Sequence, residues 1–258
     1  MKSFALVMTD NILYKNSFVN KLVLQNSKSI KLIIELNFRH PSSNKKKHLE
    51  RYIQLLGIKG MIYISGLMLK NCFQKFILAA FSKNGYSIKQ IAKKNNIKYV
   101  KVQNINSKKT IRLLEQEKVC YLLNSGNQIY RGDILKKYEN KILNRHTSLL
   151  PSYGGIYPIF WQLLNEYKDG GVTLHWVTSQ IDKGSPAYQE KIRISPKKSL
   201  FNLYEEAFKI SLKLCNQAIS DLNKGLIKTI DTDIKPSYYS WPNKVDIRKF
   251  KKKGLRIV

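Results

Sequence analysis

Short apolar runs alternate with amphipathic segments along this chain, and the alternation predicts an α/β fold. Seven runs have the length and composition of buried strands, at residues 4–8, 31–36, 97–102, 118–123, 141–144, 171–177 and 187–194. Helical segments are expected at residues 45–56, 67–81, 87–95, 107–116, 159–166 and 200–222. Between residues 87 and 123 helix and strand follow one another, which is typical of parallel strands joined by crossover helices. We therefore expect a mostly parallel sheet with helices on both faces.

Composition divides the chain into a main part and a short extension. Ser87 and Ser107 precede two of the predicted helices, where a hydroxyl can accept from an early backbone N–H. After residue 225 the chain becomes rich in Pro and aromatic residues and then in basic ones. We expect a main domain over residues 1–225 and a basic C-terminal extension over residues 226–258. The aromatic residues of the extension either stack on a sugar or base or pin the tail to the domain, and we favour the second role.

A large excess of positive charge distinguishes this chain. Lys and Arg number 46 against 17 Asp and Glu, which gives a formal net charge of +29. Such a field attracts phosphates, nucleic acid or anionic lipid. Lys, Asn, Ile and Tyr are abundant together, however, as an AT-rich coding sequence would produce. The charge therefore keeps a basic nucleic-acid- or lipid-surface-binding module among the candidate functions without selecting it.

Several protein classes are excluded by composition. With 43 % apolar and 11 % aromatic residues, the chain can bury a core, which excludes global disorder. Its 3 cysteines are far apart, so neither a disulfide framework nor a metal site is expected. The N-terminus reaches Asp10 too early for a secretory signal, and Lys70 and Lys75 interrupt the apolar stretch at residues 60–81. We expect a cytoplasmic protein without an integral membrane segment.

Candidate chemistry begins where the strand at residues 141–144 ends. Ligand sites in open parallel sheets lie beyond the carboxyl ends of the strands. Asn144 and His146 are two residues apart, so in an extended segment both side chains point to the same side. Asn offers amide donors, and His can donate or accept a proton near neutral pH. The two side chains can therefore act on one small molecule.

Two motifs connect these residues to a known family. The stretch NRHTSLLPSY at residues 144–153 resembles the NxHxSLLPxY signature of the folate-dependent formyltransferases. The stretch GVTLH at residues 171–175, followed by IDKG at 181–184 and by Gln189, resembles the GVTxH…DxG…Q signature of the same family. The resemblance covers residues 119–189 well and residues 87–119 in pattern. It implies a Rossmann-like α/β formyltransferase fold, with the catalytic domain at residues 1–225.

The resemblance also implies an activity and its catalytic residues. Family members transfer a formyl group from 10-formyltetrahydrofolate to a primary amine, without a metal. Asn144, with protonated His146 as a second donor, would then stabilise negative charge on the formyl oxygen. Asp182 would orient His146 or, through a water molecule, accept the proton of the attacking amine. Taken singly, each of these residues has an ordinary structural role open to it, whereas their joint spacing favours the catalytic one. We interpret His175 as a structural residue.

The same resemblance implies where the folate binds. Its pteridine would lie against three segments of the chain. These segments are Asn127, Gln128, Ile129 and Tyr130; Thr178, Ser179, Gln180 and Ile181; and Ser148, Leu149, Leu150 and Pro151. Many members have Arg in the position of Gly154, so a contact made by that Arg is not expected here.

The identity of the formyl acceptor is less determined by the sequence. A nucleotide-activated amino sugar is our leading candidate, because its phosphates suit a basic surface and its base could stack on the aromatic tail. Methionyl-tRNA is the first alternative, although the 36 residues after position 222 are short for the additional RNA-binding barrel of members with that activity. Glycinamide ribonucleotide is the second alternative. The sequence leaves open whether the protein forms a homodimer.

Overall fold

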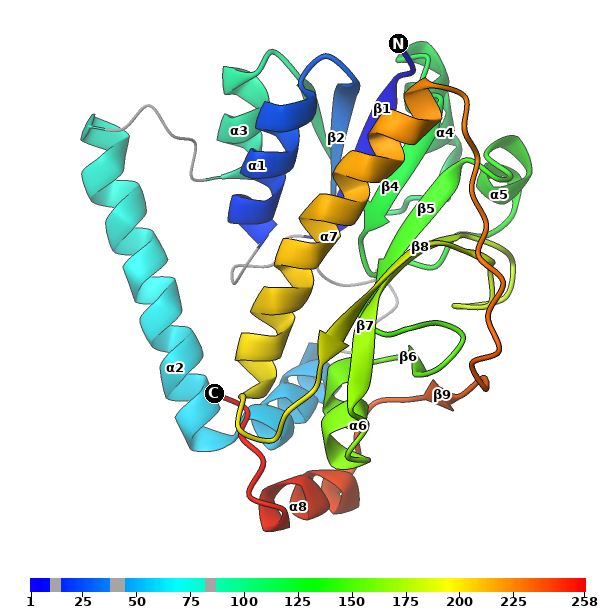
Figure 1. Cartoon of the computed structure of the whole chain (residues 1–258). Coiled ribbons are helices and arrows are strands. Elements are labelled where there is room, and N and C mark those ends of the chain that lie inside the picture. Colours follow the sequence, from blue (N-terminus) through cyan, green and yellow to red (C-terminus); the bar gives the residue numbers. More distant parts are fainter. Residues whose placement is uncertain (10–14, 38–44, 82–86) are drawn as a thin grey trace.

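Seven strands form one sheet in the computed structural model, which describes residues 1–9, 15–37, 45–81 and 87–258 (Figure 1). Their order is β3-β2-β1-β4-β5-β7-β8. The strands are β1 (Phe4–Thr9), β2 (Ile30–Leu36), β3 (Lys98–Val102), β4 (Tyr121–Ser125), β5 (Ile142–His146), β7 (Asp169–Trp176) and β8 (Pro186–Arg193). The first five in this order are parallel, and β7 runs antiparallel to β5 and β8. The predicted mostly parallel sheet is confirmed.

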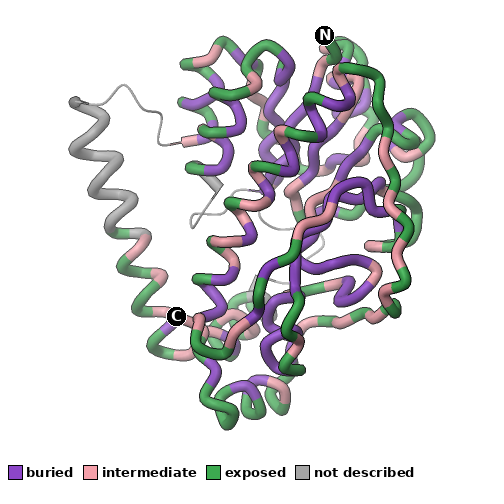
Figure 2. Tube along the Cα trace, in the orientation of Figure 1, coloured by how far each residue is buried: buried purple, intermediate pink, exposed green. Residues whose placement is uncertain are grey.

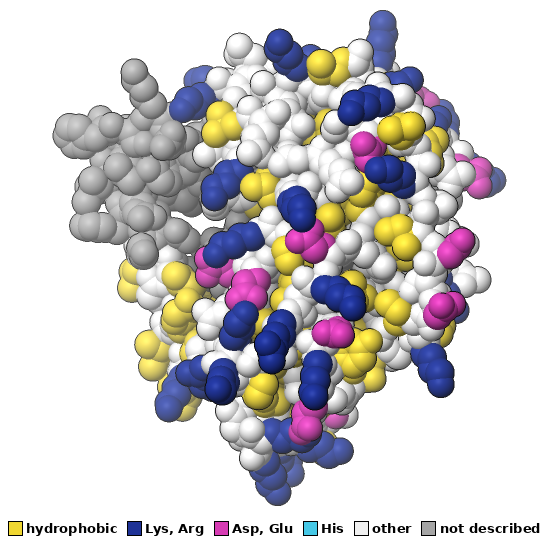
Figure 3. Space-filling view, in the orientation of Figure 1, with side chains coloured by type: hydrophobic (Ala, Val, Ile, Leu, Met, Phe, Trp, Pro, Cys, Tyr) yellow, Lys and Arg dark blue, Asp and Glu magenta, His cyan; other side chains and the backbone are white. Residues whose placement is uncertain are grey.

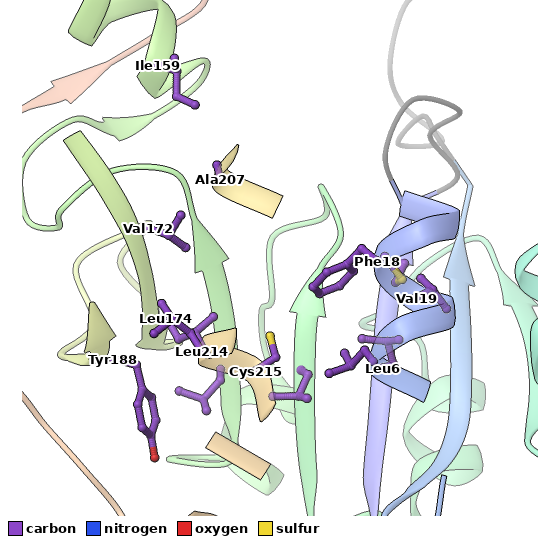
Figure 4. Packing of buried hydrophobic residues seen from close by; sticks show 14 of the residues in the cluster. Leu6, Phe18, Val19, Ile159, Val172, Leu174, Tyr188, Ala207, Leu214 and Cys215 are labelled. Carbon is purple, nitrogen blue, oxygen red and sulfur yellow. The ribbon is translucent and has the colours of Figure 1, made fainter. Parts of the chain in front are cut away.

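Helices cover both faces of this sheet, also as predicted. The described helices are α1 (Lys15–Asn26), α2 (Lys45–Phe81), α3 (Ile88–Lys94), α4 (Lys108–Gln116), α5 (Asp133–Lys137), α6 (Pro158–Leu164), α7 (Leu200–Asn223) and α8 (Lys244–Lys252). One buried cluster joins the sheet to α1, α3, α6 and α7, and a second joins it to α4 and α5. In Figure 4, Leu6 of the sheet and Phe18 of α1 lie in the same layer as Leu214 and Cys215 of α7. The buried positions follow the strands and the inner faces of the helices (Figure 2).

Local hydrogen bonds explain where the elements differ from the sequence pattern. Strand β4 begins at Tyr121 and not at residue 118, because the backbone N–H groups of Lys118 and Val119 donate to Glu115 and Leu114 and close the end of α4. Ser87 and Ser107 are N-caps, as predicted. Helix α1 was not predicted, although Phe18, Val19, Leu22 and Val23 form its buried stripe.

Helix α2 replaces two predicted helices. It spans the expected gap between residues 56 and 67, and its backbone leaves helical geometry at Gly57, with φ 62° and ψ −176°. A positive φ of this size is readily adopted by glycine because glycine lacks a Cβ. None of the described helices combines the length and apolar character needed to cross a membrane.

The C-terminal extension is joined to the domain through several contacts. Strand β9 (Tyr238–Tyr239) pairs in parallel with β6 (Gly154–Gly155). In α8, Phe250 is buried and stacks on Phe160 of α6 with ring centroids 4.6 Å apart. The backbone N–H of Leu200 donates to the carbonyl of Arg256 at 2.9 Å. Residues 238–258 therefore share the hydrophobic core of the preceding chain.

Candidate active site

Three neighbouring strands bring polar side chains to one face of the sheet. Asn124 of β4 lies opposite Asn144 of β5, and Asn144 lies opposite His175 of β7. Asn124 Nδ2 is 2.7 Å from Asn144 Oδ1, and Asn144 Nδ2 is 3.0 Å from His175 Nε2. Tyr130 continues this chain of contacts, because its hydroxyl lies 3.1 Å from Asn124 Oδ1. The site therefore centres on residues that neighbour one another only through strand pairing.

The direction of these hydrogen bonds can be worked out from their ends. His175 Nδ1 is 3.1 Å from the carbonyl oxygen of Trp176, which can only accept, so Nδ1 carries a proton. Burial, aided by the nearby His146, lowers the pKa of His175 to about 4. His175 is therefore neutral at pH 7, and its Nε2 accepts from Asn144. At the other end, burial raises the pKa of the Tyr130 hydroxyl far above its usual value, so Tyr130 donates to Asn124.

This directionality fixes the amide of Asn144. Its oxygen accepts from Asn124, and one N–H of its Nδ2 donates to His175. An amide nitrogen has two N–H donors. Asn144 is partly exposed, and the second N–H has no acceptor among the described residues. It is the donor that Asn144 can offer to a bound molecule.

His146 and Asp182 lie next to this amide. His146 Nε2 is 2.9 Å from the carbonyl oxygen of Tyr153 and must donate to it, so in the neutral ring Nδ1 holds the lone pair. Nδ1 lies 3.8 Å from Asp182 Oδ1, and His175 Nε2 lies 3.7 Å from the same oxygen. The second carboxylate oxygen of Asp182 accepts from the backbone N–H of Gly155 at 2.8 Å. The structure thus brings Asn144, His146 and Asp182 to one place, with one carboxylate oxygen facing both imidazoles.

The turn at residues 181–184 carries Asp182 to this position. Asp182 has a positive φ of 54°, a conformation in which Asp and Asn are enriched among residues other than Gly. A Cβ at Gly184 would overlap the carbonyl oxygen of Trp176, so the turn approaches β7 more closely than any other residue type permits. The sequence IDKG therefore has a structural requirement and also delivers a carboxylate.

A second hydrogen-bond network holds the segment 148–151 against the sheet. Thr173 Oγ1 donates to the carbonyl of Ser148 at 2.6 Å and accepts from the backbone N–H of Leu150 at 3.0 Å. Gln189 Nε2 donates to the carbonyl of Leu150 at 2.7 Å and to Thr173 Oγ1 at 3.0 Å. A Cβ at Gly171 would overlap Leu149. The Gly, Thr and Gln of the second sequence motif therefore position the first motif.

The expected folate segments differ in what their side chains do. Gln128 is buried, with its side chain bonded to the backbone of Gln103 and Ile105, and Tyr130 points inward to Asn124. Ser148, Leu149 and Leu150 are buried as well. By contrast, Ile129 and Ile181 are 40 % and 42 % exposed. A ligand can contact the backbone of the segments and their exposed side chains, which are Asn127, Ile129, Thr178, Ser179, Gln180 and Ile181.

Sequence reasoning missed Asn124 and gave His175 a structural role without foreseeing its contact with Asn144. His175 contacts Asn144 directly and lies 3.7 Å from Asp182. A signal for both existed, since Asn124 directly follows a predicted strand and His175 closes the GVTLH motif. Neither signal indicated contact with Asn144, because contact depends on the order of strands in the sheet.

Because Gly154 has no side chain, the C-terminal extension can pack close to it, next to the site. Its backbone N–H donates to the carbonyl of Ser237 at 2.9 Å. A Cβ at Gly154 would lie 3.2 Å from the Tyr238 ring and 3.4 Å from Asp182 Cβ. The extension therefore places the Tyr238 ring next to Asp182.

Comparisons with known proteins agree with this architecture. The N-formyltransferase from Helicobacter canadensis, in complex with folinic acid and dTDP-3-aminofucose, superposes with a TM-score of 0.61 at 17 % identity, covering 100 % of this chain and 84 % of that one. Phosphoribosylglycinamide formyltransferase from Anaplasma phagocytophilum superposes with a TM-score of 0.60 at 14 % identity, covering 93 % of this chain and 99 % of that one. At these identities the likeness concerns the fold alone.

Sequence relatives are closer but match only in part. The bifunctional polymyxin resistance protein ArnA of Wigglesworthia glossinidia brevipalpis is 36 % identical over 155 residues, which are 59 % of this chain and 24 % of ArnA. A methionyl-tRNA formyltransferase of Finegoldia magna is 30 % identical over 139 residues, 54 % of this chain and 45 % of that enzyme. The matched region thus spans less than half of either relative. The family model described as formyl transferase matches residues 78–219, more than half of the chain, and the protein therefore belongs to the formyl transferase family.

Proposed function

We propose that this protein transfers a formyl group from 10-formyltetrahydrofolate to a primary amine. The observation that carries the proposal is the fixed amide of Asn144, with one N–H left for a ligand, beside His146 and Asp182. A preset donor next to a histidine lone pair and a carboxylate suits acyl transfer, in which an oxygen gains negative charge while an amine loses a proton.

The surroundings of this polar centre fit a flat, partly apolar donor. Ile129 and Ile181 expose aliphatic surface on the two loops that follow β4 and β7. Small-molecule sites typically combine such apolar contacts with a few fixed polar groups. We expect the folate to be held by the backbone of residues 127–130, 148–151 and 178–181. When bound, it supplies an activated formyl carbonyl.

Asn144 would act on the oxygen of that carbonyl. Its free N–H is already oriented by Asn124 and neutral His175, so no reorganisation is needed as charge develops. Loss of one donor of this kind commonly lowers kcat by about 10²–10³-fold. We therefore expect Asn144→Ala to lose turnover by that factor while it keeps its fold.

His146 would transfer the proton released by the attacking amine, and Asp182 would stabilise the charge on His146. His146 Nε2 is committed to Tyr153, so Nδ1 receives the proton of the attacking amine and returns it to the leaving nitrogen. Asp182, 3.8 Å away, stabilises the imidazolium that exists between these two events. His175 cannot replace His146, because its Nε2 lone pair already accepts from Asn144 and burial lowers its pKa.

A tetrahydrofolate-release assay with Asp182→Asn tests this assignment. Asn also adopts the positive φ found at position 182, so the variant should fold and bind folate but lose turnover. Asp231→Asn, an exposed position outside the site, is the matched control and should behave as the wild type. Wild-type turnover in Asp182→Asn or in His146→Ala would refute the mechanism. Unfolding of Asp182→Asn would assign Asp182 to the turn instead.

For the acceptor, we propose the amino group of a nucleotide-activated amino sugar. Tyr238 is 56 % exposed and lies beside Gly154 and Asp182, so its ring is free to stack on a base or sugar. The other aromatic residues of the extension pin it to the domain, since Tyr239 stacks on Tyr153 and Trp161. Two structural neighbours, described as a sugar N-formyltransferase and as an N-formyltransferase in complex with dTDP-3-aminofucose, support the same acceptor class. Tyr238→Ala should raise KM for the acceptor more than it lowers kcat.

Methionyl-tRNA is the second candidate, favoured by the net charge of +29 and by the methionyl-tRNA formyltransferase relatives. An acceptor panel distinguishes the two. Turnover with a dTDP-amino sugar, and little with methionyl-tRNA or glycinamide ribonucleotide, would support our proposal. Preferred turnover with methionyl-tRNA would replace it. Inactivity with all three acceptors would refute both candidates.

A further inference from the structure

An apolar surface on α2 is not explained by the proposed chemistry. Ile58 and Ile62 are 81 % and 67 % exposed, and Ile53 is 47 % exposed. Together with Gly57 and Leu69 they line an open groove of about 540 Å³. In Figure 3, hydrophobic side chains gather over the described lower part of α2. Contiguous exposed patches of this kind mark interaction sites in soluble proteins.

The opposite face of α2 already has its partners within the domain. Leu55 is buried in the main core, and Tyr63 packs edge-on against Phe201 of α7 at 5.4 Å. A Cβ at Gly60 would lie within 4 Å of Ile257, near the C-terminus. The residues around the groove therefore lie on the side of α2 that these contacts do not use.

A cation of α8 lies at the edge of the groove. Lys251 Nζ lies within 3.7 Å of the position that a Cβ at Gly57 would take. Helix α8 and the residues after it expose seven cationic side chains, which are Lys244, Arg248, Lys249, Lys251, Lys252, Lys253 and Arg256. The acids beside them are Asp246 and Glu166, and Glu166 pairs with Lys253. Helix α2 itself contains one acidic residue, Glu50. The groove and these seven side chains together form the α2–α8 surface.

From this arrangement we infer that the α2–α8 surface docks on an anionic lipid bilayer. Exposed aliphatic side chains beside Lys and Arg are the combination by which helices bind at the bilayer interface, since the aliphatic groups enter the acyl boundary and the cations meet anionic headgroups. Nucleic acid would use the cations but leave the aliphatic groove unexplained. A second copy of this chain would bring the basic α8 of one copy toward that of the other, without the opposite charge that the bilayer supplies.

Cosedimentation with vesicles tests the inference without any measurement of activity. The probes are vesicles of phosphatidylglycerol and phosphatidylcholine, and vesicles of phosphatidylcholine alone. Binding is expected only to the first and should weaken as salt rises. Each Lys near an anionic surface contributes about fivefold in affinity, so Lys251→Gln with Lys252→Gln should weaken binding about 25-fold. Lys108→Gln with Lys109→Gln, at exposed positions of α4, is the charge-matched control.

The apolar contribution needs its own variant, because a chain of +29 is attracted to anionic vesicles from any side. Ile58→Ser with Ile62→Ser changes two exposed side chains, keeps the charge, and should weaken binding at least about tenfold. Leu226→Ser with Ile227→Ser is the matched control. These two exposed residues follow the C-terminal end of α7, away from α2, and this variant should bind vesicles as the wild type does.

Three results would overturn the inference. The first is no binding to anionic vesicles, or binding that the Ile58 and Ile62 changes leave intact. The second is self-association in sedimentation velocity that these changes abolish while vesicles are not bound, which would assign the surface to a second copy. The third is binding of a 20-nucleotide RNA that these changes abolish while vesicles are not bound, which would assign it to nucleic acid.

Discussion

Phe250→Ala measures how far the C-terminal extension belongs to the folded core. Phe250 lies in α8, is 1 % exposed, and stacks on Phe160 with ring centroids 4.6 Å apart and an interplanar angle of 11°. Its neighbours Ile247 and Leu255 are also buried in the main hydrophobic cluster. Truncation to Ala removes the ring and leaves a cavity between α6 and α8.

The cost of this change can be estimated from burial. Truncation of a buried Phe to Ala typically costs about 3–5 kcal/mol, which already includes the transfer of the ring and the cavity. A native domain has about 5–15 kcal/mol in total, so the variant should lose a large fraction of its stability. At about 2–4 °C per kcal/mol for a chain of this size, Tm should fall by roughly 6–20 °C.

Urea unfolding followed by circular dichroism is the assay, with Val245→Ala as the matched control. Val245 lies on the same helix but is 53 % exposed, so its truncation should change the free energy of unfolding by less than about 1 kcal/mol. A loss below about 1 kcal/mol for Phe250→Ala would refute the reasoning. So would a separate early transition for α8 in the wild type, because the extension would then fold independently of the domain.

Three further predictions concern single positions. The free energy of unfolding should fall as the pH drops from about 6.5 to 4. In that range the unfolded chain protonates His175, whereas burial in the folded protein lowers the pKa of His175 to about 4. His175→Gln should flatten the dependence of Tm on pH, and an unchanged profile would contradict the prediction. Gly155→Ala should detach β9 and lower Tm more than Gly132→Ala does. A Cβ at Gly155 would overlap the carbonyl of Tyr239, whereas the space around Gly132 is open. An equal decrease in Tm for the two variants would contradict this prediction. Ser199→Ala removes the capping box of α7 and should cost about 1 kcal/mol in urea unfolding, so an unchanged midpoint would contradict the cap.

The elements that sequence reasoning predicted share local causes. Helix starts at Ser87 and Ser107 depend on a hydroxyl within three residues of its donor N–H, so they are readable from the chain. Helix α8 was missed because its surface is basic, and only Ile247 and Phe250 among its residues are buried. Its stability as a helix depends on packing against α6, which no local pattern reveals.

The sequence by itself determined which chemical groups are present and which lie close along the chain, including Asn144 and His146 two residues apart on one strand. Tertiary structure alone decided that β4 and β7 flank β5, and thus that Asn124 and His175 orient the Asn144 amide. It also decided that Asp182 faces His146 across 36 residues of chain and that the extension brings Tyr238 beside it. The physical reason is that hydrogen bonds and burial act through space, so the orientation of the Asn144 amide depends on strands whose order the linear pattern does not specify.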